Sequence, residues 1–346
     1  MDIGKIDKNL AVDAEIDKGG FVFYNPEEKP FRIYGVKREG DLFVRMPKAV
    51  ANTVNDGVAQ LCTHTAGGRI RFVTNSRRIA LVIRLTAEGH MPHMPLSGSS
   101  GFDFYVNGVF YNAAFPPINM KSFAFEKILT KGGEEDVVTL NFPLYDGVKE
   151  VLIGLDEGAV IKEAPDYTYE KPIIYYGSSI TQGGCASRPG MAYESIIERA
   201  LDSNYINLGF SGSARGEDTI ADYIAGLDMS VFVYDYDHNA PNVEHLEATH
   251  ERMFLKIREK HPDLPIVMIS KPRARTGGDT EERKAIITRT YDNAVARGDK
   301  NVYILYGSDF FDGLNHEYTV DDCHPTDLGF WFMAQGILPT LKKILK

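Results

Sequence analysis

Ser179 stands on a short turn between two segments of different pattern, and this setting suits a nucleophilic hydroxyl. Before it, residues 173–176 form an apolar run of β-branched and aromatic side chains, which Gly177 ends. After it, apolar positions recur at helical spacing through residues 191–201. The pattern predicts a strand, a tight turn and a helix, so the serine lies where open α/β sheets bind ligands. Such a turn exposes a hydroxyl and frees backbone N–H groups, and hydrolysis through a serine nucleophile needs both.

The elements that must position this serine belong to a regular alternation of short apolar strands and amphipathic helices. Such an alternation predicts a parallel sheet covered by helices on both faces. The expected strands are residues 173–176, 205–208, 231–234, 266–269 and 302–305, and the expected helices lie near residues 191–201, 218–226, 243–260, 281–297 and 328–345.

Polar segments occur at four places in this half of the chain. One is the serine turn itself, and two others, residues 207–212 and 234–239, come directly after predicted strands. The fourth, Asp321-Asp322-Cys323-His324-Pro325, precedes the last helix. Because parallel strands end at one edge of their sheet, these segments can converge although they are far apart in the sequence.

The four segments resemble, in order, the four sequence blocks of the SGNH (GDSL-type) hydrolase superfamily. Gly177-Ser178-Ser179-Ile180 stands where the family has Gly-Asp-Ser-Leu, with Ser178 in place of the aspartate. Gly212 matches the glycine of the second block, and Asp321 and His324 match the Asp-x-x-His of the fourth. The resemblance covers residues 171–346.

The third block departs from the family pattern, which is Gly-x-Asn-Asp. Here the sequence reads Asp237-His238-Asn239-Ala240. Asn239 is the best match to the family's asparagine, whereas a strict count from the preceding strand puts His238 at that place. Both assignments stay open at the level of the sequence.

This resemblance implies a serine esterase with a Ser-His-Asp triad and an acyl-enzyme intermediate. Ser179 would be the nucleophile, His324 the general base and later acid, and Asp321 the group that orients the imidazole. The oxyanion hole would consist of the N–H groups of Ser179 and Gly212 and the side-chain amide of Asn239. The resemblance implies no metal and no organic cofactor.

Three further residues are candidates for contacts with substrate: Gln182, Arg188 and His238. Each of them could instead have a purely structural role, such as an ion pair between Arg188 and a carboxylate. The same holds for the central residues, because Ser179 and Asp321 could cap helices and Gly212 could only complete a turn. Asn239 could begin the next helix through an Asx turn.

The first half of the chain alternates like strands. In residues 78–85 the apolar positions fall on one face, and Asn107-Gly108 between two apolar runs predicts a hairpin. Gly101-Phe102-Asp103-Phe104-Tyr105 resembles the Gly-x-Asp-Leu-Tyr motif of a β domain attached to some SGNH-type esterases. A similar layout occurs in carbohydrate esterases that remove acetyl groups. We therefore expect a jelly-roll-like all-β sandwich over residues 1–165 and a flavodoxin-like three-layer α/β/α domain with a parallel sheet over residues 166–346.

Composition narrows the range of partners. The net charge of the 346 residues is −10, which argues against nucleic acid and anionic membranes. The three cysteines, Cys62, Cys185 and Cys323, fit neither a disulfide framework nor a zinc motif. No apolar run has transmembrane length, and residues 1–20 contain no secretory leader pattern. The expected location is the cytoplasm for the sequence as written, or the periplasm or exterior if a signal peptide has been removed; homo-oligomers are compatible with the sequence.

The leading hypothesis is therefore an esterase that acts on short acyl esters, mainly acetyl groups, of a small molecule or an oligosaccharide. A carbohydrate-binding protein with an inactive hydrolase half is an alternative from another class. A thioesterase or peptidase that uses the same triad is a third.

Overall fold

The computed structural model describes residues 15–87, 89, 91–118, 123–272, 278–311, 313 and 316–346. It divides into a β unit, formed by Met1–Val44, Thr63–Pro165 and Ser187–Pro189, and an α/β unit, formed by Arg45–Cys62, Asp166–Ala186 and Gly190–Lys346. The chain passes from the β unit to the α/β unit after Pro165, whereas residues 45–62 and 187–189 belong to the unit on the other side of that point. Among the described helices, none combines the length and the apolar character that crossing a membrane requires.

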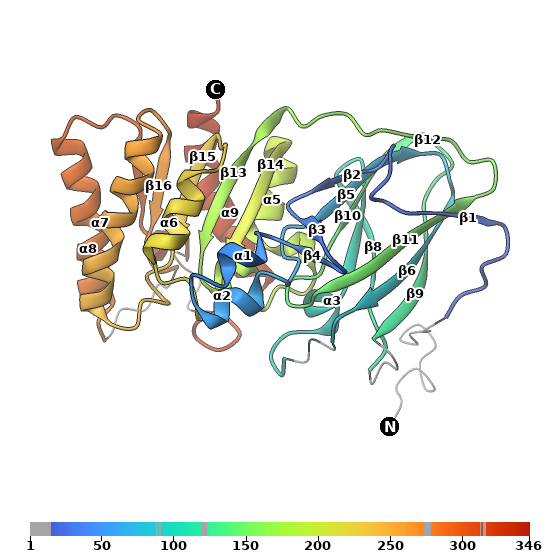
Figure 1. Cartoon of the computed structure of the whole chain (residues 1–346), viewed down its shortest axis with the longest axis horizontal. Helices are drawn as coiled ribbons and strands as arrows, with labels where there is room; N and C mark the ends of the chain where they lie inside the picture. The colour runs from blue at the N-terminus through green and yellow to red at the C-terminus, as the bar shows by residue number, and fades with distance from the viewer. Residues whose placement is uncertain are drawn as a thin grey trace. The chain divides into compact units, whose positions relative to one another are not determined.

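The β unit contains two antiparallel sheets (Figure 1). The strand order is β1-β11-β6-β9 in one and β12-β5-β10-β7-β8 in the other, where β2 also pairs with β5. The first sheet comprises β1 (Phe21–Tyr24), β6 (Arg78–Leu85), β9 (Ala124–Thr130) and β11 (Val148–Asp156). The second comprises β2 (Arg32–Tyr34), β5 (Arg69–Thr74), β7 (Phe102–Val106), β8 (Val109–Ala114), β10 (Asp136–Asn141) and β12 (Ile161–Lys162). A separate ribbon pairs β3 (Lys37–Glu39) with β4 (Leu42–Val44), and α3 (Leu96–Ser99) precedes β7.

Alternation of apolar and polar residues produces this sandwich. Ile79, Leu81 and Ile83 of β6 are fully buried, and they belong to one core with Phe72 of β5 and Phe104 of β7 from the opposite sheet. The predicted hairpin joins β7 to β8, and its two turn residues, 107 and 108, have φ angles of 49° and 76°. Two successive positive φ angles are what a turn matching the twist of both strands requires.

The α/β unit is built on a five-stranded parallel sheet of order β14-β13-β15-β16-β17 (Figure 1). The strands are β13 (Tyr169–Gly177), β14 (Ser203–Gly209), β15 (Val231–Asp235), β16 (Ile266–Ile269) and β17 (Val302–Leu305). Their order is that of flavodoxin-like folds, in which the first strand has its successors on both sides. Ligands of such folds bind at the carboxyl end of that first strand, which here is β13.

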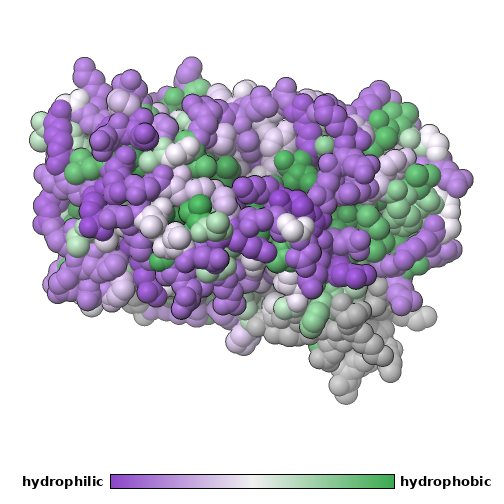
Figure 2. Space-filling view, in the orientation of Figure 1, coloured by the Kyte–Doolittle hydropathy of each residue, from purple (hydrophilic) through white to green (hydrophobic). Residues whose placement is uncertain are grey.

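Helices cover both faces of this sheet. Tyr176 and Tyr234 share a core with residues of α6 (Asp218–Ala225), α7 (Val243–Lys260) and α8 (Thr280–Ala296). On the opposite face, Tyr175 meets Tyr193 at the start of α5 (Tyr193–Leu201), and Tyr193 stacks on Phe330 of α9 (Asp327–Ile344). The outer sides of α7 and α8 are mostly hydrophilic (Figure 2). The sequence expectation of a three-layer α/β/α fold after an all-β sandwich is thereby confirmed.

Residues 45–62, which carry α1 (Lys48–Ala51) and α2 (Asp56–Leu61), belong to the α/β unit although β strands precede and follow them in the sequence. Arg45 anchors the segment, because its buried guanidinium donates to the backbone carbonyls of Asn207 at 3.2 Å and Gly209 at 2.5 Å. The same group lies over the ring of Phe210 at 4.7 Å. A charged group without solvent is stabilised here by carbonyl acceptors and an aromatic face.

Candidate active site

The turn after β13 divides its two serines between two tasks. The hydroxyl of Ser178 accepts a hydrogen bond from the N–H of Ile180 at 3.2 Å and so caps the one-turn helix α4 (Ser179–Gln182). Gly183 ends this helix with a φ of 95°, which favours glycine. The capping function that the sequence allowed for Ser179 is thus performed by its neighbour, and the Ser179 hydroxyl contacts His324 instead.

His324 links Ser179 to Asp321. The Oγ of Ser179 lies 2.9 Å from Nε2 of His324, and Nδ1 of the same ring lies 2.7 Å from Oδ2 of Asp321. An ionised carboxylate can only accept, so Nδ1 carries the proton and Nε2 keeps a lone pair for the serine hydroxyl. The structure therefore brings three of the predicted site residues into one hydrogen-bonded line within the α/β unit.

Asp321 also organises the loop that carries the histidine. Its Oδ1 accepts from the backbone N–H groups of Cys323 at 3.1 Å and His324 at 2.8 Å. Desolvation opposes ionisation of this carboxyl, but the hydrogen bonds from the backbone and ring of His324 and its charge outweigh that effect, and the pKa of Asp321 lies below its ordinary value. Asp321 is thus an anion wherever a serine hydrolase would work.

Gly212 lies on the loop after β14 with a φ of 68°, a left-handed conformation that L side chains rarely adopt. A Cβ at this position would meet no heavy atom within 4 Å, so backbone conformation, not space, calls for glycine. Within the described part of the chain, no group accepts a hydrogen bond from the Gly212 N–H. The neighbouring Ser211 N–H, in contrast, donates to Oε1 of Gln182 at 3.0 Å.

The two candidates of the third block point to different partners. The Oδ1 of Asn239 accepts a hydrogen bond from the N–H of Ala214 at 3.4 Å. The oxygen of the amide therefore faces Ala214, and its NH₂ group points away from this contact. No described residue accepts from that NH₂ group. The buried ring of His238 has its Nε2 3.6 Å from Oδ1 of Asp237. Asn239 is therefore attached to the loop of Gly212, and His238 faces an acid of its own loop.

Gln182 and Arg188, which the sequence suggested as substrate contacts, are both engaged by protein groups. Gln182 is fully buried and holds the loop of the second block through Ser211. Arg188 lies in the segment assigned to the β unit, where it donates to Asp103 at 3.0 Å and to the hydroxyl of Tyr105 and stacks on Phe110 at 3.7 Å. A direct contact with substrate through these bonded groups would require the side chains to leave their partners.

The Gly-x-Asp-Phe-Tyr motif therefore has a structural function inside the β unit. A Cβ at Gly101 would lie 2.4 Å from the carbonyl oxygen of Ser97, so only glycine fits. Asp103 is completely buried, with Oδ1 bound to Asn141 at 2.7 Å and Oδ2 to Arg188. A buried carboxylate needs such partners to remain stable away from water.

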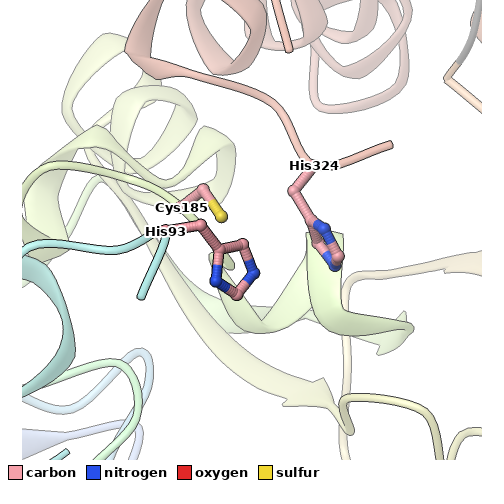
Figure 3. A group of neighbouring side chains, drawn as sticks. All are labelled: His93, Cys185 and His324. Carbon is pink, nitrogen blue, oxygen red and sulfur yellow. The ribbon is translucent and has the colours of Figure 1, made fainter. Parts of the chain in front are cut away.

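Cys185 lies beside the line of Ser179, His324 and Asp321 without belonging to it. Its sulfur is within 4.8 Å of a ring nitrogen of His324. Figure 3 shows the two side chains together with His93, which belongs to the other unit. Burial, with smaller effects of Asp321 and Cys323, raises the pKa of the Cys185 thiol to about 12. A thiol is nucleophilic and metal-binding only as its anion, so Cys185 is a neutral packing residue at physiological pH.

The sequence is similar to two family models that together span most of the chain. Residues 170–342 match the GDSL-like Lipase/Acylhydrolase family, and residues 21–161 match the N-terminus of Esterase_SGNH_hydro-type proteins. The chain belongs to the GDSL-like Lipase/Acylhydrolase family. Members of this family are esterases, so the GDSL-like chain is a hydrolase of the esterase class, and the resemblance noted in the sequence is confirmed.

Solved structures extend this likeness to both halves of the GDSL-like chain. A Bacteroides ovatus protein described as a GDSL-like lipase is 31% identical, with a TM-score of 0.84 and coverage of 94% of this chain and 98% of its own. The salicylyl-acyltransferase SsfX3 of a tetracycline biosynthetic pathway is 18% identical, with a TM-score of 0.78 and coverage of 95% and 98%. A family two carbohydrate esterase of Cellvibrio japonicus is 14% identical, with a TM-score of 0.62 and coverage of 94% and 98%. Among curated proteins, none matches.

Two residues near Ser179, Thr181 and Asp235, were not among the predicted site residues. The hydroxyl of Thr181 donates to Asp235 at the end of β15, and its carbonyl accepts from the side chain of Asn207 at 2.6 Å. Their position at strand ends next to the serine turn is a signal that the sequence contains. The sequence does not show that Thr181 and Asp235 contact each other, because this contact depends on β13 and β15 being neighbours.

Proposed function

We propose that this GDSL-like hydrolase is a serine esterase that removes short acyl groups, mainly acetyl, from carbohydrate. The observation that supports this best is the hydrogen-bonded line from Ser179 Oγ through the His324 ring to Asp321, with separations of 2.9 and 2.7 Å. Groups of these types in this order convert an ordinary alcohol into a nucleophile. Family membership supports the same chemistry independently.

The first half of the reaction transfers the acyl group to the enzyme. The Oγ of Ser179 bonds to the ester carbonyl carbon while its proton passes to Nε2 of His324. Asp321 stabilises the resulting imidazolium without taking a proton itself. The tetrahedral intermediate then expels the sugar oxygen, which receives the proton from His324, and an acyl-Ser179 ester remains. In the second half water repeats these steps as the nucleophile and releases the carboxylic acid.

The oxyanion of each tetrahedral intermediate needs donors that are free before substrate arrives. Among the described residues none accepts from the N–H of Gly212 or the NH₂ group of Asn239, so both meet this condition, and the bond between Asn239 and Ala214 joins their loops. With the N–H of Ser179, they form the oxyanion hole of this proposal. Preorganised donors of this kind supply one of the largest contributions to catalysis of acyl transfer.

The choice of substrate class relies on relatives of similar layout. Among the structures similar to this chain are an acetyl xylan esterase of Butyrivibrio proteoclasticus, at 12% identity, and a Clostridium thermocellum family two carbohydrate esterase in complex with cellohexaose, at 16%. At these identities the likeness shows the fold alone. It supports an acylated sugar as the first substrate to test.

The proposal predicts a burst of p-nitrophenol from p-nitrophenyl acetate, followed by a steady rate that EDTA does not change. The burst arises because acylation by an activated ester precedes slower deacylation. Acetate release from a panel of acetylated mono- and oligosaccharides then identifies the alcohol. Binding of these sugars without release of acetate would favour the carbohydrate-binding alternative, and faster cleavage of thioesters or peptides would favour the third.

A pair of substitutions distinguishes the two candidates of the third block. Asn239→Ala is expected to lower kcat by on the order of 10²–10³, the usual effect of removing one oxyanion donor, with a much smaller change in KM. His238→Ala removes a neighbouring buried side chain from the same loop and serves as the matched control, with a loss of less than about tenfold in kcat. If His238→Ala shows the large loss and Asn239→Ala the small one, the donor has been assigned to the wrong residue.

A further inference from the structure

The helix that carries Ser179 is too short to hold its own position. α4 contains four residues, and a single helical turn has little stability in isolation. It is held by side-chain bonds to two adjacent strands. The carbonyl of Thr181 accepts from Asn207 of β14 on one side, and the hydroxyl of Thr181 donates to Oδ1 of Asp235 of β15 on the other.

Gly177 provides the space for the contact between Thr181 and Asp235. It pairs with Asp235 in the register of β13 and β15, and its φ is not positive. A Cβ there would lie 1.7 Å from Oδ1 of Asp235 and 2.2 Å from Oγ1 of Thr181. The first-block glycine is thus required because these two side chains occupy the position where its own side chain would be.

The surroundings of Asp235 keep this acid out of water. Asp235 is 2% exposed, and its Oδ2 has no hydrogen-bond partner among the described residues. Glu194 of α5 is fully buried, and neither of its carboxyl oxygens has a partner within the same described set. Burial raises the pKa of both acids, and the charge of Asp235 further raises the pKa of Glu194. Burial therefore favours the protonated, neutral form of both acids.

The other ionisable groups around this pair do not reverse that conclusion. Tyr175 of β13 and Tyr193 of α5 are completely buried phenols whose pKa values burial raises well above 10, so they are also neutral. Asp237, two residues along the chain from Asp235, adds a further acidic neighbour. Arg45 is the cation that acts on Glu194, and its N–H groups bind backbone carbonyls and Asn207.

We propose that Asp235 is a positioning residue for the esterase reaction, which acts through the Thr181 hydroxyl to hold the Ser179 turn in line with His324. This proposal rests on the proposed function. The acid accepts through Oδ1, as an asparagine amide would, and keeps its proton on Oδ2. The bond should therefore tolerate replacement of the acid by its amide but not loss of the hydroxyl.

The test measures how fast Ser179 reacts with a fluorophosphonate, followed by mass spectrometry of the intact protein, together with kcat and KM for p-nitrophenyl acetate. Thr181→Val keeps the shape and removes the hydroxyl, and it should slow both modification and kcat about tenfold with KM changed less than twofold. Thr181→Ser restores the hydroxyl, and Asp235→Asn keeps the acceptor. Both should remain within about threefold of the wild type at pH 7.

Thr290→Val is the matched control. Thr290 is 2% exposed in α8, and its hydroxyl lies 2.8 Å from Nδ1 of His250, so the substitution also removes a buried side-chain hydrogen bond of the α/β unit. It should lower the melting temperature and leave the modification rate unchanged. If Thr181→Val behaves in the same way, or if Asp235→Asn slows modification tenfold or more, the positioning role is wrong. Should Thr181→Val fail to fold, Asp235→Leu takes its place, because it removes the acceptor of the Thr181 hydroxyl at similar side-chain size: it should slow modification about tenfold, and an unchanged rate in a folded variant would overturn the positioning role.

The fluorophosphonate also separates this proposal from the proposed function. If the wild type is modified at Ser179 but Thr181→Val is modified equally fast, the esterase remains and only the positioning role fails. If the wild type is not modified at Ser179 and does not hydrolyse p-nitrophenyl acetate, the proposed function fails first.

Discussion

Ser179→Ala is expected to lower kcat for p-nitrophenyl acetate and for acetylated sugars by on the order of 10⁶, to the limit of detection. The substitution removes the oxygen that would form the acyl-enzyme, which lies 2.9 Å from Nε2 of His324. Ser179 is largely buried, with 9% exposure, so the fold should tolerate the loss of one oxygen atom. Steady-state rates, burst amplitude and melting temperature together measure the effect.

Ser178→Ala provides a matched control one residue away. It also replaces a buried serine by alanine, but the hydroxyl it removes caps α4 through the N–H of Ile180. The expected cost is about 1 kcal/mol of stability, and the burst should persist with full amplitude. If Ser178→Ala abolished the burst and Ser179→Ala did not, the nucleophile would be Ser178, and the contact between Ser179 and His324 would not be part of the reaction.

The strands of the α/β unit could be predicted closely because buried parallel strands have a simple pattern. β16 and β17 occupy residues 266–269 and 302–305, as the continuous apolar runs in the sequence indicate. The carboxyl ends of such strands share one edge, so the convergence of Ser179, His324 and the loop of Gly212 on that edge could also be anticipated.

The assignment of residues 45–62 to the α/β unit could not be predicted in the same way. Arg45 fixes this segment through the carbonyls of Asn207 and Gly209, more than 160 positions away in the sequence. Every residue offers a carbonyl, so no pattern of side chains marks these acceptors. The two short helices of this segment also have too few residues to show a periodicity.

The role of Gln182 shows a second limit of sequence reasoning. A polar residue three positions after Ser179 is equally compatible with a substrate contact and with a backbone contact. The choice depends on Gly209, where a Cβ would lie 2.2 Å from the backbone nitrogen of Gln182. That close approach of β14 to α4 lets Gln182 reach the N–H of Ser211, and it is a property of packing between distant segments.

Asp321→Asn is expected to lower kcat by about 10³–10⁴-fold while leaving the loop intact. The asparagine oxygen can still accept from the N–H groups of Cys323 and His324, which Oδ1 of Asp321 now accepts. Its NH₂ group, however, would face Nδ1 of His324 as a donor. The ring would then carry its proton on Nε2, toward Ser179, and could not accept the proton of the serine hydroxyl. Rates over a range of pH, with the melting temperature, measure this effect.

The pH dependence of kcat tests the direction in which the pKa of Asp321 is shifted. The pKa of Asp321 lies below its ordinary value, so its ionised form persists as the pH falls through the range in which exposed carboxyls take up protons. The pH profile of the wild type should therefore contain no step in kcat near pH 4 that is due to Asp321, so replacing Asp321 by Asn should remove no such step.

Asp322→Asn is the matched control, because it removes the same charge from the next residue, and asparagine tolerates the φ of 64° found there. It should retain kcat within about twofold. Equal losses from the two substitutions would mean that the charge of the loop matters and that Asp321 does not select the tautomer of His324.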